Sequence, residues 1–289
     1  MSFIPDLSPP YRLSLPARQG TAVVFGSPHS GAEYPADFVA GAILGRAALR
    51  SSEDAFVDQL LAGAPGHGAP VIAARYPRAY VDLNRAETEL DPALIEGLGG
   101  QAGRSARVAA GLGVIPRVVA GGRAIYRGKI AAAEAEARLA AVWRPYHDCL
   151  GGLLAETVAG FGQAVLVDVH SMPHEAVRGQ GAAHPEIVLG NRHGAAASPA
   201  VTEAVAQAFR EEGFRVGMNA PFAGAFISER YGHPKAGCHV VQVEIDRALY
   251  MDEAQICLRA DFNGFSRRFD RVVARLCKAM APGQRLVAE

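Results

Sequence analysis

The sequence predicts a three-layer α/β fold, in which helices cover both faces of a mainly parallel, mixed central sheet. Short apolar runs typical of buried strands alternate along the chain with longer segments of helical spacing. In addition, 49% of the 289 residues are hydrophobic, which is enough for a large core. No repeat or linker interrupts this pattern, so we expect a single domain over residues 1–289.

The first expected elements follow one another closely. Residues 21–26 form a short apolar run before a Ser-Pro pair, which is typical of a buried strand followed by a turn. Residues 54–62 carry apolar side chains at helical spacing. Residues 70–74 and 79–83 have the composition of two further strands.

The central part continues the alternation. Residues 131–159 place apolar side chains on one face of a long amphipathic helix. Strands are expected over residues 164–169 and 186–190. The helix expected over residues 198–212 begins with Ser-Pro, a pair that favours a helix start.

The last two expected elements are a strand over residues 239–245 and a helix over residues 252–279. Asp252 and Glu253 at the start of that helix and Lys278 near its end match the helix macrodipole. In open α/β sheets ligands bind beyond the carboxyl ends of the strands, so polar residues at strand ends are the candidates for a site.

Charge and targeting signals exclude several classes of function. Lys plus Arg equals Asp plus Glu, so no basic excess favours a nucleic-acid partner. The first residues lack the charged start and apolar run of a signal peptide, and no stretch reaches the ~18 apolar residues of a membrane span. The four cysteines are scattered, as is typical of reduced thiols. We expect a cytoplasmic protein with a small-molecule partner and no nucleic-acid or membrane partner; the sequence allows a homo-oligomer.

Two histidines at strand ends indicate a metal site. His29 follows the strand expected at 21–26, His170 ends the one expected at 164–169, and Glu53 and Asp54 open a helix. Two histidines, one carboxylate and a water are the ligand set of an open catalytic zinc site. Asp168 is a poor candidate to orient His170, because it can point to a neighbouring strand instead. The alternative is that both histidines are ordinary hydrogen-bonded residues.

Two polar segments are candidates to bind a substrate anion. Asn84 and Arg85 end an expected strand and suit a carboxylate, although a surface salt bridge is the alternative. Arg123 and Arg127 follow a Gly-Gly turn and could clamp an anion or polarise a carbonyl; a solvated face is equally compatible with their spacing.

Glu244 is the candidate general base. It alternates with Val243 and Ile245 in an apolar strand, on the same face as Val240 and Gln242. Burial would raise its pKa toward neutrality, which suits a base. The alternative is a glutamate that faces water from an edge strand.

Taken together, these segments resemble the N-formylglutamate amidohydrolase family over residues 21 to about 255. The motifs that carry the resemblance occur in the order SPHSG, EDAFVDQL, YVDLNR, GGRAIYR, VDVHSMP, IVLGNRHG, NAPFAGAFISERYG and QVEIDRALYMDE. The family releases formate and glutamate from N-formyl-L-glutamate in histidine degradation, and its fold is similar to that of zinc carboxypeptidases (phosphorylase/hydrolase-like). The resemblance implies metal ligands at His29 and His170, carboxylate binders at Asn84 and Arg85, and the base at Glu244.

The sequence departs from the carboxypeptidase pattern at the third ligand. Those enzymes carry a glutamate three residues after the first histidine, where this chain has Ala32, with Glu33 one residue further on. We therefore expect Asp54 to be the third ligand, with Glu53 and Glu33 as alternatives. A second departure is Asn191, where the family often has an aspartate.

The expected mechanism is hydrolysis at one zinc ion, or another divalent ion, held by His29, Asp54 and His170. Glu244 takes the proton of the attacking water and passes it to the leaving amine. Binding roles for the dianionic substrate are expected as follows: Arg127 for the oxyanion, Asn84 and Arg85 for the α-carboxylate, and Arg123 or Arg192 for the side-chain carboxylate.

Two other functions fit the same residues. One is a related zinc amidohydrolase or carboxypeptidase that acts on another N-acyl amino acid or a peptide. The other is a non-catalytic ligand-binding protein of the same fold, in which case metal would bind without turnover of any amide.

Overall fold

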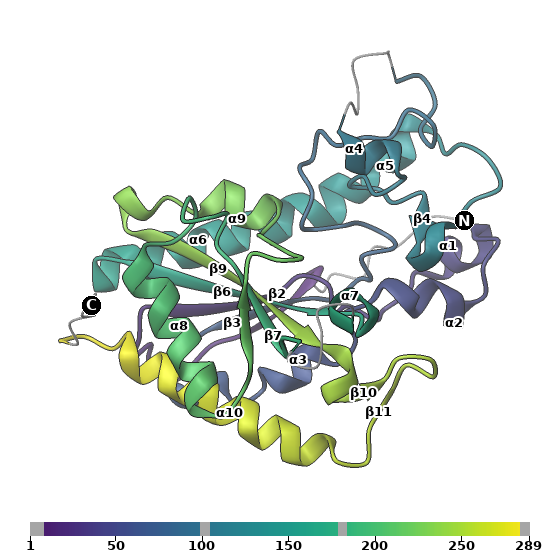
Figure 1. Cartoon of the computed structure of the whole chain (residues 1–289). Helices are drawn as coiled ribbons and strands as arrows, with labels where there is room; N and C mark the ends of the chain where they lie inside the picture. Colours follow the sequence, from purple (N-terminus) through teal and green to yellow (C-terminus); the bar gives the residue numbers. More distant parts are fainter. Residues whose placement is uncertain (1–8, 99–104, 179–183, 284–289) are drawn as a thin grey trace.

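The computed structural model describes residues 9–98, 105–178 and 184–283. A seven-stranded sheet in the order β1-β3-β2-β6-β9-β7-β8 forms its centre (Figure 1). Strand β1 is antiparallel to β3 and β7 is antiparallel to β9, whereas the other neighbours are parallel. The predicted mixed, mainly parallel sheet is therefore confirmed. Its strands are β1 (Tyr11–Ser14), β2 (Val23–Ser27), β3 (Val71–Ala74), β6 (Ala164–Met172), β7 (Ile187–Gly190), β8 (Val216–Met218) and β9 (Cys238–Asp246).

The described helices differ widely in length, and none is long and apolar enough to cross a membrane. They are α1 (Ala36–Gly41), α2 (Arg46–Leu49), α3 (Val57–Leu60), α4 (Ala106–Ala109), α5 (Ala132–Arg138), α6 (Arg144–Phe161), α7 (Glu175–Arg178), α8 (Pro199–Glu211), α9 (Phe226–Tyr231) and α10 (Phe262–Ala279). A π-helical turn (Leu139–Trp143) joins α5 to α6, and 3-10 turns are η1 (Arg50–Ser52), η2 (Ala64–His67), η3 (Ala120–Gly122), η5 (Pro234–Ala236) and η6 (Arg247–Leu249). Two small hairpins pair β4 (Val118–Val119) with β5 (Arg123–Ala124) and β10 (Met251–Asp252) with β11 (Cys257–Leu258).

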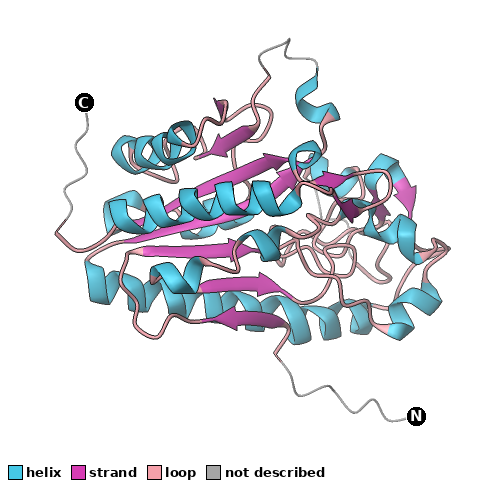
Figure 2. Ribbon diagram, turned by 90° about the horizontal axis from the view of Figure 1, so that it is seen from below, coloured by secondary structure: helices cyan, strands magenta, loops and turns pink. Residues whose placement is uncertain are grey.

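Helices cover both faces of the sheet, which gives the three predicted layers. Helices α6 and α9 lie on one face and α8 and α10 on the other (Figure 1). Successive residues of a strand point to opposite faces. Accordingly, Val165 and Val167 of β6 pack in the core beneath α8 and α10, and Leu166 packs in the core beneath α6. Figure 2 shows loops gathered beyond one end of the strands.

Polar residues replace apolar ones on the α6 face near the carboxyl ends of β6 and β9. Asp168 and His170 continue the face of Leu166, and the parallel register places Gln242 beside Asp168 and Glu244 beside His170. All four polar side chains are buried. The predicted alternation of Gln242 and Glu244 is therefore confirmed, and the sheet itself brings four polar side chains together.

Two expected elements are shorter than their patterns indicated. The helix expected over 54–62 is the single turn α3, which starts after Phe56, a residue in the left-handed region with φ of 67°. The helix expected over 252–279 begins only at Phe262, where its apolar stripe begins. Residues 251–258 form the β10–β11 hairpin instead, and Asp252 accepts a hydrogen bond from the backbone N–H of Gln255.

The strand expected over 79–83 is absent, and this segment makes turns. Val81 and Leu83 are buried in the same core as α6, which explains the strand-like apolar pattern. A sheet ladder does not form, and the N–H of Asp82 donates instead to the carbonyl of Val114. The apolar pattern of this segment indicates only that its side chains are buried, and buried side chains occur in turns as well as in strands. The edge strands β1 and β8 are only four and three residues long and half-buried or exposed, so they carry no buried apolar run, and they were not expected.

His147 on α6 anchors this turn segment. Its Nε2 donates to the carbonyl of Leu83 at 3.0 Å, and its Nδ1 lies 3.1 Å from the hydroxyl of Tyr231. Burial, assisted by the charge of Arg230, lowers the pKa of His147 to about 3. The fold therefore holds this imidazole in its neutral form.

We expect His147 to make the fold acid-sensitive. An unfolded histidine titrates near pH 6.5, so only the unfolded state gains a proton as the pH falls from about 6.5 toward 3. The free energy of unfolding should lose about 2 kcal/mol by pH 5 relative to pH 7.5 through this group alone. Urea unfolding of the His147→Gln variant should show a smaller loss, and the exposed-site variant His193→Gln should match the wild type. An equal loss in wild type and His147→Gln would contradict this account.

Candidate active site

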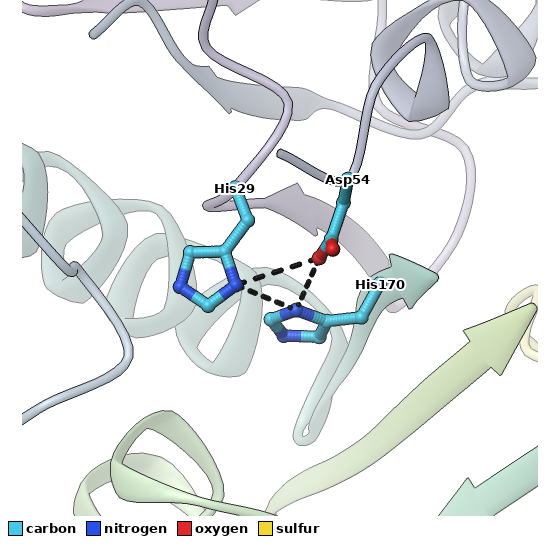
Figure 3. A group of neighbouring side chains, drawn as sticks. All are labelled: His29, Asp54 and His170. Atoms are coloured by element: carbon cyan, nitrogen blue, oxygen red, sulfur yellow. Dashed lines mark hydrogen bonds and ion pairs between the residues drawn. The ribbon is translucent and has the colours of Figure 1, made fainter. Parts of the chain in front are cut away.

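His29, Asp54 and His170 converge at the carboxyl ends of β2 and β6 (Figure 3). The Nδ1 atom of His170 lies 3.1 Å from Nδ1 of His29 and 3.0 Å from Oδ2 of Asp54. The third side of this triangle, from His29 Nδ1 to Asp54 Oδ2, is 3.4 Å. The backbone N–H of Asp54 donates to the carbonyl of His29, so two segments distant in sequence are tied together. All three side chains are buried.

Each histidine offers its remaining ring nitrogen to a buried carboxylate. His29 Nε2 lies 2.7 Å from Asp82 Oδ1, and His170 Nε2 lies 3.0 Å from Asp168 Oδ2. Hydrogen bonds to carboxylates place the protons on the Nε2 atoms, so both Nδ1 atoms present lone pairs. Two lone pairs and a carboxylate oxygen then face one another, and a positive charge between them, either a proton or a metal ion, stabilises this arrangement.

The spacing also fits a metal. Tetrahedral zinc with ligands at about 2.0–2.1 Å has its ligand atoms about 3.3 Å apart, close to the three distances found here. These three residues could therefore hold such an ion, and the carboxylates of Asp82 and Asp168 supply the orienting partners that metal-bound histidines usually have.

The electrostatics of the cluster favour positive charge at its centre. Burial opposes a charge on His170, but the carboxylates of Asp168 and Asp54 raise its pKa well above the usual value. Burial likewise opposes charge on Asp54, yet hydrogen bonds from His170 and His29 hold its pKa well below the usual value. The second oxygen of Asp54 accepts a hydrogen bond from Arg247 at 2.9 Å. The carboxylate is therefore ionised and fixed in place.

The structure corrects one expectation and separates the alternative ligands. Asp168 does orient His170, because residues two apart share a strand face and lie only about 6.6 Å apart along it. Glu53 is buried away from the histidines, bound by Tyr34 and Arg50. Glu33 lies on the surface, where it pairs with two arginines. Of the three candidate carboxylates, only that of Asp54 reaches both histidines.

Glu244 lies beside the cluster, and the pKa of its carboxyl group is shifted from the usual value. Burial raises the pKa of Glu244 to about 7, and the negative charge of Asp54 acts in the same direction, whereas His170 lowers it. Gln242 donates to Oε1 of Glu244 at 2.9 Å, and no described residue binds Oε2. A carboxylate that titrates near neutrality and keeps one oxygen available is suited to proton transfer.

A cavity of about 670 Å³ opens over these residues. His29, Asp54, His170 and Glu244 line its floor at the strand ends, and the other walls come from η1, α4, β4, η3 and the loop before α9. The arginines in its lining are Arg78, Arg85, Arg107 and Arg247. The cavity therefore has the size of a small-molecule site and carries several positive charges.

Asn84 and Arg85 both line the cavity, with different freedom. The side-chain oxygen of Asn84 accepts a hydrogen bond from the N–H of Ile227, and its amide nitrogen lies 3.3 Å from His170 Nε2. Arg85 donates to the carbonyls of Leu112 and Asn84. Asn84 is thus largely engaged with the protein, whereas Arg85 has no carboxylate partner among the described residues.

The structure does not bring the other predicted arginines to this cavity. The exposed Arg127 is outside its lining, and Arg123 donates to Ser51 Oγ at 2.8 Å and to nearby carbonyls. Arg192 lies 3.7 Å from Glu229. The two segments that carry them turn the guanidinium groups toward protein partners or solvent, which spacing in the sequence does not reveal.

Four cavity or supporting residues escaped the sequence reasoning: Asp82, Arg78, Arg107 and Arg247. Asp82 and Arg247 stand inside the YVDLNR and QVEIDR segments, so their proximity to Asn84 and Glu244 was a usable signal. Arg78 and Arg107 lie in a turn and on the one-turn helix α4, where no periodic pattern marks them.

Comparison with known proteins agrees with this site. Residues 21–251 match the family described as N-formylglutamate amidohydrolase. The N-formylglutamate deformylase of Pseudomonas aeruginosa is 33% identical over 245 residues, 83% of this chain and 86% of that protein. The enzyme of the same name from Pseudomonas putida is 29% identical over 236 residues, 81% of this chain and 83% of that protein.

Solved structures show the same relation. The crystal structure of an N-formylglutamate amidohydrolase from Ralstonia eutropha is 32% identical and superposes with a TM-score of 0.87, covering 94% of this chain and 98% of that one. A protein from Agrobacterium tumefaciens, 17% identical with a TM-score of 0.64 over 92% of this chain and 96% of its own, shares the fold. This chain belongs to the N-formylglutamate amidohydrolase family and is an amidohydrolase.

Proposed function

We propose that the chain hydrolyses N-formyl-L-glutamate to formate and L-glutamate by a metal-dependent reaction. The observation that carries this proposal is the convergence of two histidine lone pairs and one carboxylate oxygen beside Glu244, in a cavity lined by arginines. The names of the relatives support this substrate. We further propose that the reaction serves histidine degradation in the cytoplasm.

His29, Asp54 and His170 would hold one divalent cation, for which zinc is our first choice because imidazole and carboxylate ligands suit it. Bound there, the cation would lower the pKa of water and polarise the formyl carbonyl. Asp82 and Asp168 keep both histidines in the tautomer that presents Nδ1.

Glu244 would move the proton. Its carboxylate takes a proton from the attacking water as the oxygen–carbon bond to the formyl group forms. The same carboxyl group then gives the proton to the leaving nitrogen as the carbon–nitrogen bond breaks. Gln242 holds one carboxylate oxygen of Glu244 in place, which leaves the other for these transfers.

The arginines of the cavity match a substrate with two carboxylates. Two of them are already neutralised, since Arg78 pairs with Asp82 and Arg247 pairs with Asp54. Arg85 and Arg107 have no carboxylate partner among the described residues of the chain. We therefore assign the α-carboxylate of the substrate to the buried Arg85 and its side-chain carboxylate to the exposed Arg107.

The Arg107 assignment predicts a loss that depends on the substrate. The Arg107→Gln variant should raise KM for N-formyl-L-glutamate about 10- to 150-fold, because a hydrogen bond to a charged group contributes about 1.5–3 kcal/mol. N-formyl-L-norvaline, which lacks the side-chain carboxylate, should lose much less. Arg123→Gln, an exposed arginine outside the cavity, is the matched control and should leave both KM values unchanged. Equal increases in KM for both substrates would contradict the assignment of the side-chain carboxylate to Arg107.

The proposal is tested by formate release from N-formyl-L-glutamate, with zinc-loaded and chelator-treated protein. Fast release that disappears on chelation and returns with zinc supports the reaction and its metal dependence. Formate release that is unaffected by metal depletion would contradict the proposed metal dependence. No release by zinc-loaded protein would overturn the substrate, and other N-acyl amino acids or peptides would be tried next.

A further inference from the structure

A second group of histidine and aspartate side chains lies at the same end of the sheet. It consists of His174, His184 and Asp246, and the ligand atoms of the three lie within 4.8 Å of one another. Asp246 ends β9, directly beside the last residue of β6 in the parallel register. His174 follows β6 by two residues, and His184 precedes β7, the antiparallel neighbour of β9. Three adjacent strands therefore bring these side chains together.

This outer cluster resembles the inner one in its residue types and in the arrangement of its rings. His174 Nδ1 lies 2.8 Å from Oδ2 of Asp246, and the two imidazole rings are 5.3 Å apart at an angle of 80°. The rings of His29 and His170 are 4.8 Å apart at 66°. Both clusters thus combine two imidazoles, set edge to face, with one buried aspartate.

Hydrogen bonds hold the residues of the outer cluster in place but leave atoms that could bind an ion. Oδ1 of Asp246 accepts a hydrogen bond from the N–H of Ala248, which leaves Oδ2 for His174 or an ion. The N–H of His174 donates to Glu253, and the carbonyl of His184 accepts from Arg215. The ring nitrogens of His184 have no hydrogen-bond partner among the described residues.

A simple histidine–aspartate pair does not account for this arrangement. Such a pair needs one imidazole, whereas here a second ring, without a hydrogen-bond partner among the described residues, places a nitrogen within 4.8 Å of the same carboxylate. Two neutral imidazoles and one carboxylate are the donor set of zinc and of related transition metals, and not of calcium or magnesium. The half-exposed histidines also leave coordination positions open to water.

We propose that His174, His184 and Asp246 form a second transition-metal site, separate from the inner cluster. None of the three lines the cavity, although Met172, Pro173 and Arg247 next to them in sequence do. Arg247 follows Asp246 and binds Asp54 of the inner cluster. The outer ion would therefore lie at the rim of the cavity, one residue removed from the side chain that positions an inner ligand.

The test is the number of zinc ions bound per chain, measured by metal analysis after metal-depleted full-length protein is dialysed against excess free zinc. Wild type should bind two. The His174→Gln/His184→Gln double variant and the His184→Gln variant should each bind one, and circular dichroism should show that both are folded. His184→Gln removes a ring that makes no hydrogen bond in the described structure, so it should fold normally.

His67→Gln is the matched control. His67 is also a half-exposed histidine 3.1 Å from an aspartate, Asp270, but no third ligand joins this pair in the described residues. It should keep two ions. The site is overturned if wild type and both outer variants bind the same number of ions. If wild type binds only one ion and the outer variants lose it, the outer site is supported and a metal ion at the inner cluster is contradicted. The experiment therefore tests the two proposals separately.

Discussion

Replacing Glu244 by glutamine should lower kcat/KM for N-formyl-L-glutamate by about 10²- to 10⁴-fold, the contribution typical of a positioned general base. The amide is nearly isosteric with the acid and can keep the hydrogen bond to Gln242, so the fold should persist. The zinc content of Glu244→Gln should equal that of wild type, because Glu244 is not part of the inner cluster. Steady-state kinetics and metal analysis on the same preparation measure both effects.

The pH profile distinguishes a base from a merely structural glutamate. Glu244 must be deprotonated to accept a proton, and burial raises its pKa to about 7. Wild-type kcat/KM should therefore fall up to tenfold per pH unit on the acid side of this pKa. A bound cation would move that limb to lower pH by favouring the carboxylate. The residual activity of Glu244→Gln should lack the limb; if the limb persists, another group is the base.

The floor of this site was predictable because strand alternation is a strong signal. His170 and Glu244 stand near the ends of apolar strands. A period of two puts His170 on the face of Asp168 and Glu244 on the face of Gln242, and the parallel register of β6 and β9 then makes these one face. His29 follows a strand in the same way. Asp54 was harder to assign, since three carboxylates of the chain were compatible with the motifs. Only the tertiary contacts show that Glu53 is occupied by Tyr34 and Arg50.

The walls of the cavity were not predictable, because long cations and turns carry no period. Arg123 and Arg127 stand next to a Gly-Gly turn, and a rotation of the backbone there decides whether their guanidinium groups reach the cavity or bind Ser51 and solvent. Arg107 lies on a helix of a single turn and projects into the cavity lining without any local pattern. The same limit explains the segment 79–83, where burial imitated a strand.

Replacing Asp54 by asparagine should abolish zinc binding at the inner cluster and lower kcat/KM by about 10³-fold or more. A divalent cation contributes several kcal/mol of transition-state stabilisation, and each 1.36 kcal/mol is a factor of ten in rate. The asparagine oxygen is a weaker ligand, and the change also removes the charge that binds Arg247. Competition with a chromophoric chelator measures zinc affinity, and formate release measures the rate.

The neighbouring Glu53 provides the matched control, since it is also a carboxylate and is as buried as Asp54. Glu53→Gln should lose about 1–3 kcal/mol of stability, because Arg50 and Tyr34 lose their charged partner in a buried site. It should nevertheless keep its zinc and its rate at 25 °C. If Asp54→Asn retains zinc and Glu53→Gln loses it, the third ligand is Glu53 and the cluster rearranges when metal binds. If Asp54→Asn keeps the zinc affinity and the rate of wild type, as Glu53→Gln is expected to do, neither carboxylate is a metal ligand, and the inner cluster is not the metal centre of the reaction.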